Sequence, residues 1–425
     1  MNALNGLRGI SCLIVFNYHL LFVFTHATDR SWGTVTDHGD NKGFMQLPFV
    51  RLLYAGHSMV IIFFVISGYV LSHKPMKLMR AGKYAELQQN LSSSVFRRGM
   101  RLFGPAITGT FITMILTHVG LFEAGKHVRT DPELFKGNNE EHPVLFASIY
   151  EQLGDWTHEM GRLVTDVWGW GLYYNNYDPH LWTIPLEFRS SMLLFLSLLG
   201  FSRLRPLPRL VAMLALCSLC FIYWARWEVF LFLAGMLFAE LDLVSGIFTD
   251  TSPLDEKAKG GSRPYMRFTW ALVLIFGLFL SSCPTLEANN APGFAYLSSF
   301  MPASYDGQTA RPLQALGGSL VVWSFMHLPR VQRLFNTSFA QYFGKISYAF
   351  YIVHGPILHC FGYNLVLFCW SWTGQETEAE YALGLGLATT VILPIAVWAA
   401  DLFVRAVDLP CVELARSIES RLSTG

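Results

Sequence analysis

The sequence predicts an all-α protein, a polytopic membrane helix bundle of about ten transmembrane helices. Of the 425 residues, 52% are hydrophobic and only 14% are charged, whereas soluble domains carry roughly 25% charged residues. The chain also contains many apolar runs close to the length of about 20 residues that one membrane crossing requires. The net charge of +1 argues against a nucleic-acid partner, for which a strongly basic face would be expected.

The ten spans are predicted from apolar runs separated by polar or basic segments. No linker or internal repeat divides the chain, so we expect one transmembrane domain over residues 1–410 and a short cytosolic tail over residues 411–425. The predicted spans are 6–25, 55–73, 101–121, 180–201, 209–224, 227–248, 268–283, 311–327, 346–369 and 381–407.

Lys and Arg in the short loops predict the orientation, because these residues favour the cytosolic side. The loop predicted over residues 73–101 is the most basic, and placing it in the cytosol places both termini there. The stretch 122–178 then lies on the far side, and its Trp and Tyr residues suit either an interfacial aromatic belt or a lid over an acceptor site. We expect a multi-pass protein of the endoplasmic reticulum or plasma membrane, with the lipid bilayer as a partner. The oligomeric state stays open.

Arg8 and His19 lie in the first predicted span with ten residues between them. Eleven helical steps return to nearly the same face, so the two side chains share a face roughly 16 Å apart along the axis. A His past mid-membrane is unfavourable unless it is paired or faces a polar cavity. From spacing alone, a packing histidine with an arginine that reaches the interface is also consistent.

The fourth predicted span carries a second polar face, formed by His180, Thr183 and Glu187. Seven helical steps separate the first from the last, which brings both to one side of the helix. An intramembrane carboxylate is a functional hypothesis by default, so Glu187 could orient His19 or bind acceptor hydroxyls. The structural alternative is an ion pair with Arg189 or another basic residue.

Metal motifs are not found in the sequence. It contains no H-E-x-x-H segment and no paired Cys/His pattern, and most of its seven cysteines fall inside apolar runs. Cys217 and Cys220 have a metal-like spacing but no second pair. We therefore expect no metal and no permanently bound cofactor.

Five segments, in this order along the chain, resemble the acyltransferase-3 family of membrane-bound acyl-CoA-dependent O-acyltransferases, and the chain looks closest to fungal members. They are Arg8 with His19, Phe63-Phe64 with Ser67-Gly68-Tyr69, Arg97-Arg98 with Arg101-Leu102 and Pro105, Leu181-Trp182-Thr183 with Glu187, and Ile346-Ser347-Tyr348 with Tyr351 and His354. The fourth segment departs from the family pattern by carrying Pro185 and Arg189.

This resemblance implies an enzyme that uses acyl-CoA as co-substrate, most often for acetylation, and a hydroxylated acceptor. Some fungal members act in secondary-metabolite biosynthesis, so a small metabolite is the expected acceptor, with a carbohydrate or a lipid as the alternative. His19 could act as a general base or carry the acyl group transiently. A polytopic transporter is the alternative from another class of protein, and a non-catalytic scaffold is a third.

The resemblance, together with the polar face shared by His180, Thr183 and Glu187, implies a role for each candidate residue. The arginines suit coenzyme A because they can contact phosphate in bidentate fashion. The implied catalytic residues are His19, Arg8 and Glu187. The implied coenzyme A-binding residues are Arg97, Arg98 and Arg101. The implied acceptor or pocket residues are His180, Thr183, Ser67, Tyr348 and His354.

Overall fold

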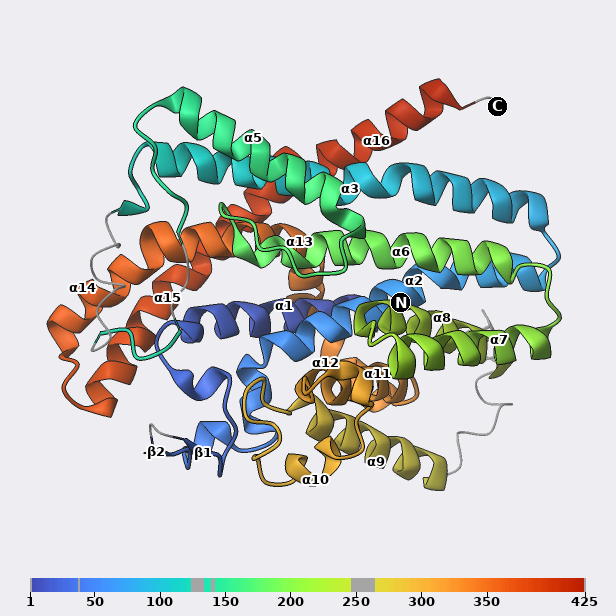
Figure 1. The fold of residues 1–425 in the computed structure, drawn as a ribbon, viewed down its shortest axis with the longest axis horizontal. Coiled ribbons are helices and arrows are strands. Elements are labelled where there is room, and N and C mark those ends of the chain that lie inside the picture. The colour runs from blue at the N-terminus through green and yellow to red at the C-terminus, as the bar shows by residue number, and fades with distance from the viewer. Residues whose placement is uncertain (1, 37–38, 124–133, 139–141, 246–263, 424–425) are drawn as a thin grey trace. The chain divides into compact units, whose positions relative to one another are not determined.

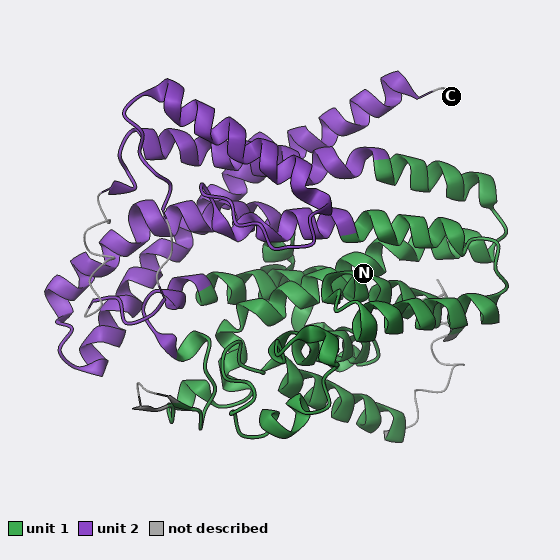
Figure 2. Ribbon diagram, viewed as in Figure 1, with its two compact units in different colours: residues 1–18, 27–95, 190–344 green, residues 19–26, 96–189, 345–425 purple. Residues whose placement is uncertain are grey.

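The computed structural model describes residues 2–36, 39–123, 134–138, 142–245 and 264–423 (Figure 1). Its described residues are mostly helical, which confirms the all-α prediction, and a small antiparallel pair joins β1 (Val35–Thr36) to β2 (Gly39–Asp40). The chain forms two compact units (Figure 2). Unit 1 comprises Met1–Tyr18, Ala27–Val95 and Ser190–Gly344, and unit 2 comprises His19–His26, Phe96–Arg189 and Lys345–Gly425.

Four helices contribute residues to both units. They are α1 (Asn2–Phe22), α3 (Tyr84–His118), α6 (Thr183–Gly200) and α13 (Ser338–Ile357). The other helices of unit 1 are α2 (Gly56–Arg80), α7 (Pro206–Ser218), α8 (Trp227–Ser245), α9 (Pro264–Ser281), α10 (Phe294–Ser298), α11 (Ala310–Met326) and α12 (Pro329–Phe335), with the short turns η2 (Phe44–Gln46), η3 (Val50–Tyr54), η7 (Leu219–Tyr223) and η8 (Ala303–Tyr305). The turn η1 (His26–Thr28) lies where the chain passes from unit 2 back to unit 1.

Glycines let the helices of unit 1 approach closely. A Cβ on Gly68 of α2 would lie 2.2 Å from the Phe232 carbonyl oxygen, and one on Gly235 of α8 would lie 2.3 Å from the Val65 carbonyl oxygen. These are backbone atoms, so only glycine permits the contact. Small residues at such crossings are typical of helix packing in membranes.

Among its described residues, unit 2 contains four further helices and four short helical turns. They are α5 (Ile149–Thr165), α14 (Tyr363–Thr373), α15 (Glu378–Phe403) and α16 (Leu409–Leu422), with the short turns η5 (Asp166–Trp168), η6 (Pro179–Trp182), η9 (Leu358–Gly362) and η10 (Val404–Asp408). The π-helical turns η9 and η10 join α13 to α14 and α15 to α16 without a break in the helical chain.

Six helical runs among the described residues are long and apolar enough to cross a membrane, and Tyr265–Ser281 is a shorter apolar helix. The six runs are Gly56–Arg80, Tyr84–His118, Pro179–Gly200, Pro206–Tyr223, Ser338–Thr373 and Glu378–Leu422. Helices α1, α8, α9 and α11 occupy the other four predicted spans. Several apolar helices therefore indicate a membrane protein, whereas the count of ten, the orientation and the position of both termini stay predictions.

Most of the segment 73–101, predicted to lie between two membrane spans, is helical. Helix α2 continues to Arg80 and α3 begins at Tyr84, so only a short turn separates them. Apolar character marks the part of a helix that can lie in a membrane, but the backbone hydrogen bonds continue beyond it. The turn falls at Gly82, whose φ of 69° lies in the left-handed region that favours glycine after a helix.

Two further segments that were predicted to lie outside the membrane also contain helices. Helix α5 lies within the stretch 122–178 and begins with a capping box, in which Ser148 accepts from the Tyr150 N–H and Glu151 accepts from the Ser148 N–H. The spacing of Ser148 and Glu151 is a recognised helix-start signal. Helix α16 fills most of the predicted tail over residues 411–425.

Candidate active site

Three histidines from distant parts of the sequence come together in unit 2. His19 lies on α1, His180 on η6 and His354 on α13. The ring centroids are 4.0 Å apart for His19 and His180, 5.1 Å for His19 and His354, and 4.9 Å for His180 and His354. His180 and His354 are only 4% and 1% exposed, and His19 is half-buried. We refer to these three residues as the histidine cluster.

Asp178 fixes the orientation of His180. Its side chain caps η6 by accepting from the His180 backbone N–H at 3.1 Å, and the same oxygen lies 2.8 Å from the His180 Nδ1. Pro179 occupies the first position of the turn, where its missing N–H is not needed. Asp178 is 3% exposed. A buried carboxylate on Nδ1 holds the imidazole in one orientation.

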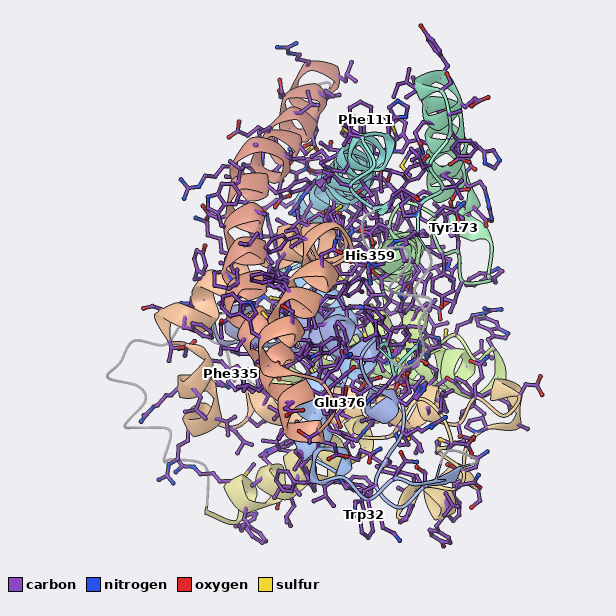
Figure 3. The ribbon with its side chains drawn as sticks, turned by 90° about the vertical axis from the view of Figure 1, so that its left-hand side faces the viewer. Trp32, Phe111, Tyr173, Phe335, His359 and Glu376 are labelled. Atoms are coloured by element: carbon purple, nitrogen blue, oxygen red, sulfur yellow. The ribbon has the colours of Figure 1, made fainter. Side chains whose placement is uncertain are left out.

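Helix α5 and the loop that follows it hold Asp178 in place. The Asn175 Oδ1 accepts from the backbone N–H groups of Tyr177 and Asp178. The Asn175 Nδ2 donates to the Tyr173 hydroxyl at 3.2 Å, and that hydroxyl donates to Glu159 of α5 at 2.5 Å. Burial, together with the bond to Glu159, raises the pKa of Tyr173, which Figure 3 labels. Tyr173 therefore stays a protonated donor near neutral pH.

Helix α13 brings His354 and Gly355 to the cluster. The His354 Nδ1 lies 2.7 Å from the Tyr351 carbonyl oxygen and 3.1 Å from that of Phe350. Its Nε2 is buried and has no hydrogen-bond partner among the described residues. A Cβ on Gly355 would lie 2.5 Å from the His180 Nδ1. Residue 355 must therefore be small for α13 to pack this closely against His180.

Thr183 and Tyr348, both predicted pocket residues, make hydrogen bonds between elements of unit 2. The Thr183 Oγ1 lies 2.6 Å from the Tyr351 hydroxyl, which also donates to the His180 carbonyl oxygen. The Tyr348 hydroxyl donates to the Leu102 carbonyl oxygen of α3 at 2.5 Å. These bonds fix α13 against η6, α6 and α3. A contact with an acceptor stays a prediction for both residues.

Glu187 forms an ion pair with Arg98 of α3, with 2.8 Å between Oε1 and Nη2. This agrees with the alternative in which Glu187 pairs with a basic residue, although the partner is not Arg189. The Arg189 guanidinium instead donates to the carbonyl oxygens of Val167 and Gly169. A catalytic role for Glu187 stays a prediction.

The three predicted coenzyme A-binding arginines all lie on α3 within unit 2. Arg97 pairs with Glu419 of α16 at 3.1 Å, in addition to the pair of Arg98 with Glu187. Arg101 is exposed. A phosphate group that binds to Arg97 or Arg98 would have to exchange with a carboxylate or share the guanidinium with it.

Arg8 and Ser67 belong to unit 1. Arg8 lies on α1 with its guanidinium carbon 6.0 Å from the centroid of the Phe63 ring, and Ser67 is half-buried on α2. The catalytic role of Arg8 and the pocket role of Ser67 stay predictions. The other nine predicted site residues lie in unit 2. Three of these nine, His19, His180 and His354, lie close together.

Asp178, Gly355 and Glu159 were not predicted as site residues. Asp178 before Pro179 is a helix-start pattern, and this signal could have identified it. Gly355 and Glu159 carry no such signal, because their importance depends on contacts with residues far away in the chain. A separate pair, His142 and His359, places its Nδ1 atoms 3.0 Å apart; Figure 3 labels His359.

Comparison with known proteins decides the family. A family model described as an acyltransferase domain matches residues 1–401. The chain belongs to the acyltransferase-3 family. This confirms the resemblance of the five sequence segments, and it supports an enzyme that transfers acyl groups. No solved structure matches the chain.

Three fungal relatives of this acyltransferase-3 protein extend along nearly its whole length. The O-acetyltransferase PaAT-1 of Phomopsis amygdali is 34% identical and covers 99% of this chain and 84% of its own. The acyltransferase R4 of a Phoma species is 29% identical, and the match covers 96% of this chain and 94% of the relative. The acyltransferase clz18 of Cochliobolus lunatus is 28% identical, and the match covers 98% of this chain and 96% of the relative. These relatives agree with the predicted likeness to fungal members.

Proposed function

We propose that this protein is a membrane-bound O-acyltransferase that moves an acetyl group from acetyl-CoA to a hydroxyl of a small metabolite. The observation that carries the proposal is the contact between the His19 and His180 rings, with the Asp178 Oδ1 2.8 Å from the His180 Nδ1. Two neighbouring imidazoles backed by a carboxylate suit general-base catalysis. The name of one relative, an O-acetyltransferase, supports acetyl as the group and oxygen as the acceptor atom.

In the proposed reaction the acceptor oxygen attacks the thioester carbonyl carbon. His19 takes the hydroxyl proton as the carbon–oxygen bond forms, and the carbon–sulfur bond then breaks. The proton passes to the leaving thiolate, so the products are the ester and free coenzyme A. His180 shares the positive charge of the protonated His19, and Asp178 stabilises that charge because an opposite charge nearby favours the protonated imidazole.

The donor would approach along α3. Arg97, Arg98 and Arg101 lie within two turns of that helix, and guanidinium groups bind phosphates in bidentate geometry. We propose that a coenzyme A phosphate displaces Glu187 or Glu419 from its arginine partner. Both termini in the cytosol would place this end of α3 on the side of the membrane that holds acyl-CoA.

The proposal is tested with labelled acetyl-CoA and the protein purified in detergent. Transfer of label to a pooled extract of hydroxylated metabolites is measured, together with release of free coenzyme A. His19→Ala should reduce transfer by about 100- to 10,000-fold, which is the usual contribution of a general base. His158→Ala is the matched control, because His158 lies on α5 with 69% of its side chain exposed.

Wild-type activity in folded His19→Ala would remove His19 from the mechanism. Absence of both transfer and coenzyme A release in the wild type would contradict the enzyme proposal. Flux of an unmodified solute across vesicles containing the protein would then favour a transporter.

A further inference from the structure

We propose that His19, His180 and His354 form a binding site for one Zn²⁺ ion. One ring nitrogen of each histidine lies within 4.8 Å of the others. Imidazole nitrogen is a preferred zinc ligand, and three histidines with one open position is an established arrangement for catalytic zinc. No local motif reveals this site in the sequence, because each ligand comes from a different segment of the chain.

The contacts around two of the rings are those of metal ligands. A histidine that binds a metal almost always donates its other ring N–H to a carboxylate or a backbone carbonyl. His180 meets the first case, because its Nδ1 lies 2.8 Å from Asp178. His354 meets the second, because its Nδ1 lies 2.7 Å from the Tyr351 carbonyl oxygen. Both contacts leave Nε2 as the nitrogen that can bind the ion.

The Nε2 atom of His354 gives a second, independent reason. It is buried without a hydrogen-bond partner among the described residues, and the whole residue is 1% exposed. A buried polar atom without a partner is unfavourable because it loses its hydrogen bonds to water. A metal ion at the centre of the cluster would satisfy this lone pair.

The distances permit an ion after small ring movements. With Zn–N bonds of about 2.0–2.1 Å, the nitrogens of a tetrahedral site are roughly 3.3 Å apart. The present separations of up to 4.8 Å would therefore shorten by at most about 1.5 Å. Side-chain rotation of His19, the half-buried member, would supply part of this movement. Asp178 lies beside one ligand and would balance part of the added charge.

The fourth position of the ion would be open to an oxygen ligand. A zinc-bound oxygen loses its proton more readily than the free group, because the ion stabilises the anion. An acceptor hydroxyl at this position would be a stronger nucleophile, and this part of the inference rests on the proposed function. In a zinc-bound site His19 is a ligand rather than a base. Loss of activity in His19→Ala therefore cannot separate the two mechanisms, whereas metal content can.

The experiment measures metal directly and needs no acyl acceptor. The full chain, purified in detergent with a histidine-free affinity tag, is equilibrated with Zn²⁺ and analysed for bound zinc by mass spectrometry. Replacement by Co²⁺ provides a visible spectrum that reports tetrahedral coordination. We expect one ion per chain in the wild type and in His158→Ala, and loss of the ion in His354→Ala.

Asp178→Asn serves as a second variant that keeps all three ligands. Because it removes the carboxylate that contacts the His180 Nδ1, it should weaken zinc binding by about 10- to 100-fold. A folded wild-type protein that holds no zinc after equilibration would overturn the proposal. Unchanged zinc binding in folded His354→Ala would also overturn it, because the ion would then lie elsewhere. Acyl transfer by a zinc-free protein would leave the proposed function intact while removing the zinc role.

Discussion

Gly355→Ala should impair catalysis while leaving the helix that carries it intact. The added Cβ would lie 2.5 Å from the His180 Nδ1 and 3.3 Å from the Asp178 Oδ1, whereas ordinary contact begins at about 3.4 Å. The ring must therefore move by about 0.9 Å. That movement can lengthen the 2.8 Å contact between His180 and Asp178 beyond hydrogen-bonding distance.

The expected loss follows from this displacement. A hydrogen bond to a charged group contributes about 1.5–3 kcal/mol, which corresponds to a decrease in kcat of about 10- to 150-fold if the bond is lost only in the transition state. Alanine in place of glycine favours the helix by roughly 1 kcal/mol. Thermal stability should therefore change little while turnover falls.

The assay compares kcat for acyl transfer and the melting temperature of Gly355→Ala with those of Gly386→Ala. Gly386 lies on α15, and a Cβ there would meet nothing within 4 Å, so this control should keep wild-type turnover. If folded Gly355→Ala turns over at the wild-type rate, the close approach of α13 to His180 has no catalytic importance and the reasoning is refuted.

Three more predictions follow from the contacts described above. Asp178→Asn should lower kcat by at least about 100-fold with little change in KM for acetyl-CoA, because the positioning carboxylate acts on the transition state; an equal rise in KM would indicate a binding role instead. Arg98→Glu and Glu187→Arg should each lower the melting temperature, and the double exchange should recover part of the loss. The coupling free energy should be about 0.5–3 kcal/mol, as for residues in contact. Additive effects would show that the pair is not coupled. Gly235→Ala should destabilise the protein by about 1–3 kcal/mol, because helices α2 and α8 would have to separate. The added Cβ would otherwise meet the backbone of α2. A melting temperature equal to that of Gly386→Ala would contradict this prediction.

Hydrophobic runs predicted the positions of the main helices because burial in lipid or core requires a continuous apolar segment. Each predicted span overlaps a helix in the described part of the chain, and residues 246–248 of the span 227–248 lie outside the described residues. The same signal could not predict where helices end, since α2 and α3 continue through basic residues on both sides of Gly82. It also missed α5, whose two faces differ in polarity and which begins at the capping box of Ser148 and Glu151.

The candidate site was predicted residue by residue but not as an assembly. Family resemblance indicated His19 and His354, and helical periodicity placed His180 on the polar face of the fourth predicted span. Their convergence depends on how three separate segments pack, which no local pattern encodes. Glu187 shows the same difficulty, because an intramembrane carboxylate can serve catalysis or pair with arginine, and only the structure identifies Arg98 as its partner.

The support of His180 is a continuous piece of chain. Glu159, Tyr173, Asn175 and Asp178 all precede His180 within the segment that begins at α5, and their hydrogen bonds form a single connected path. Because these residues are close in the sequence, residues 148–182 can be replaced as one block. Chimeras that exchange this block with a fungal relative would test whether acceptor choice depends on it or on the rest of the protein.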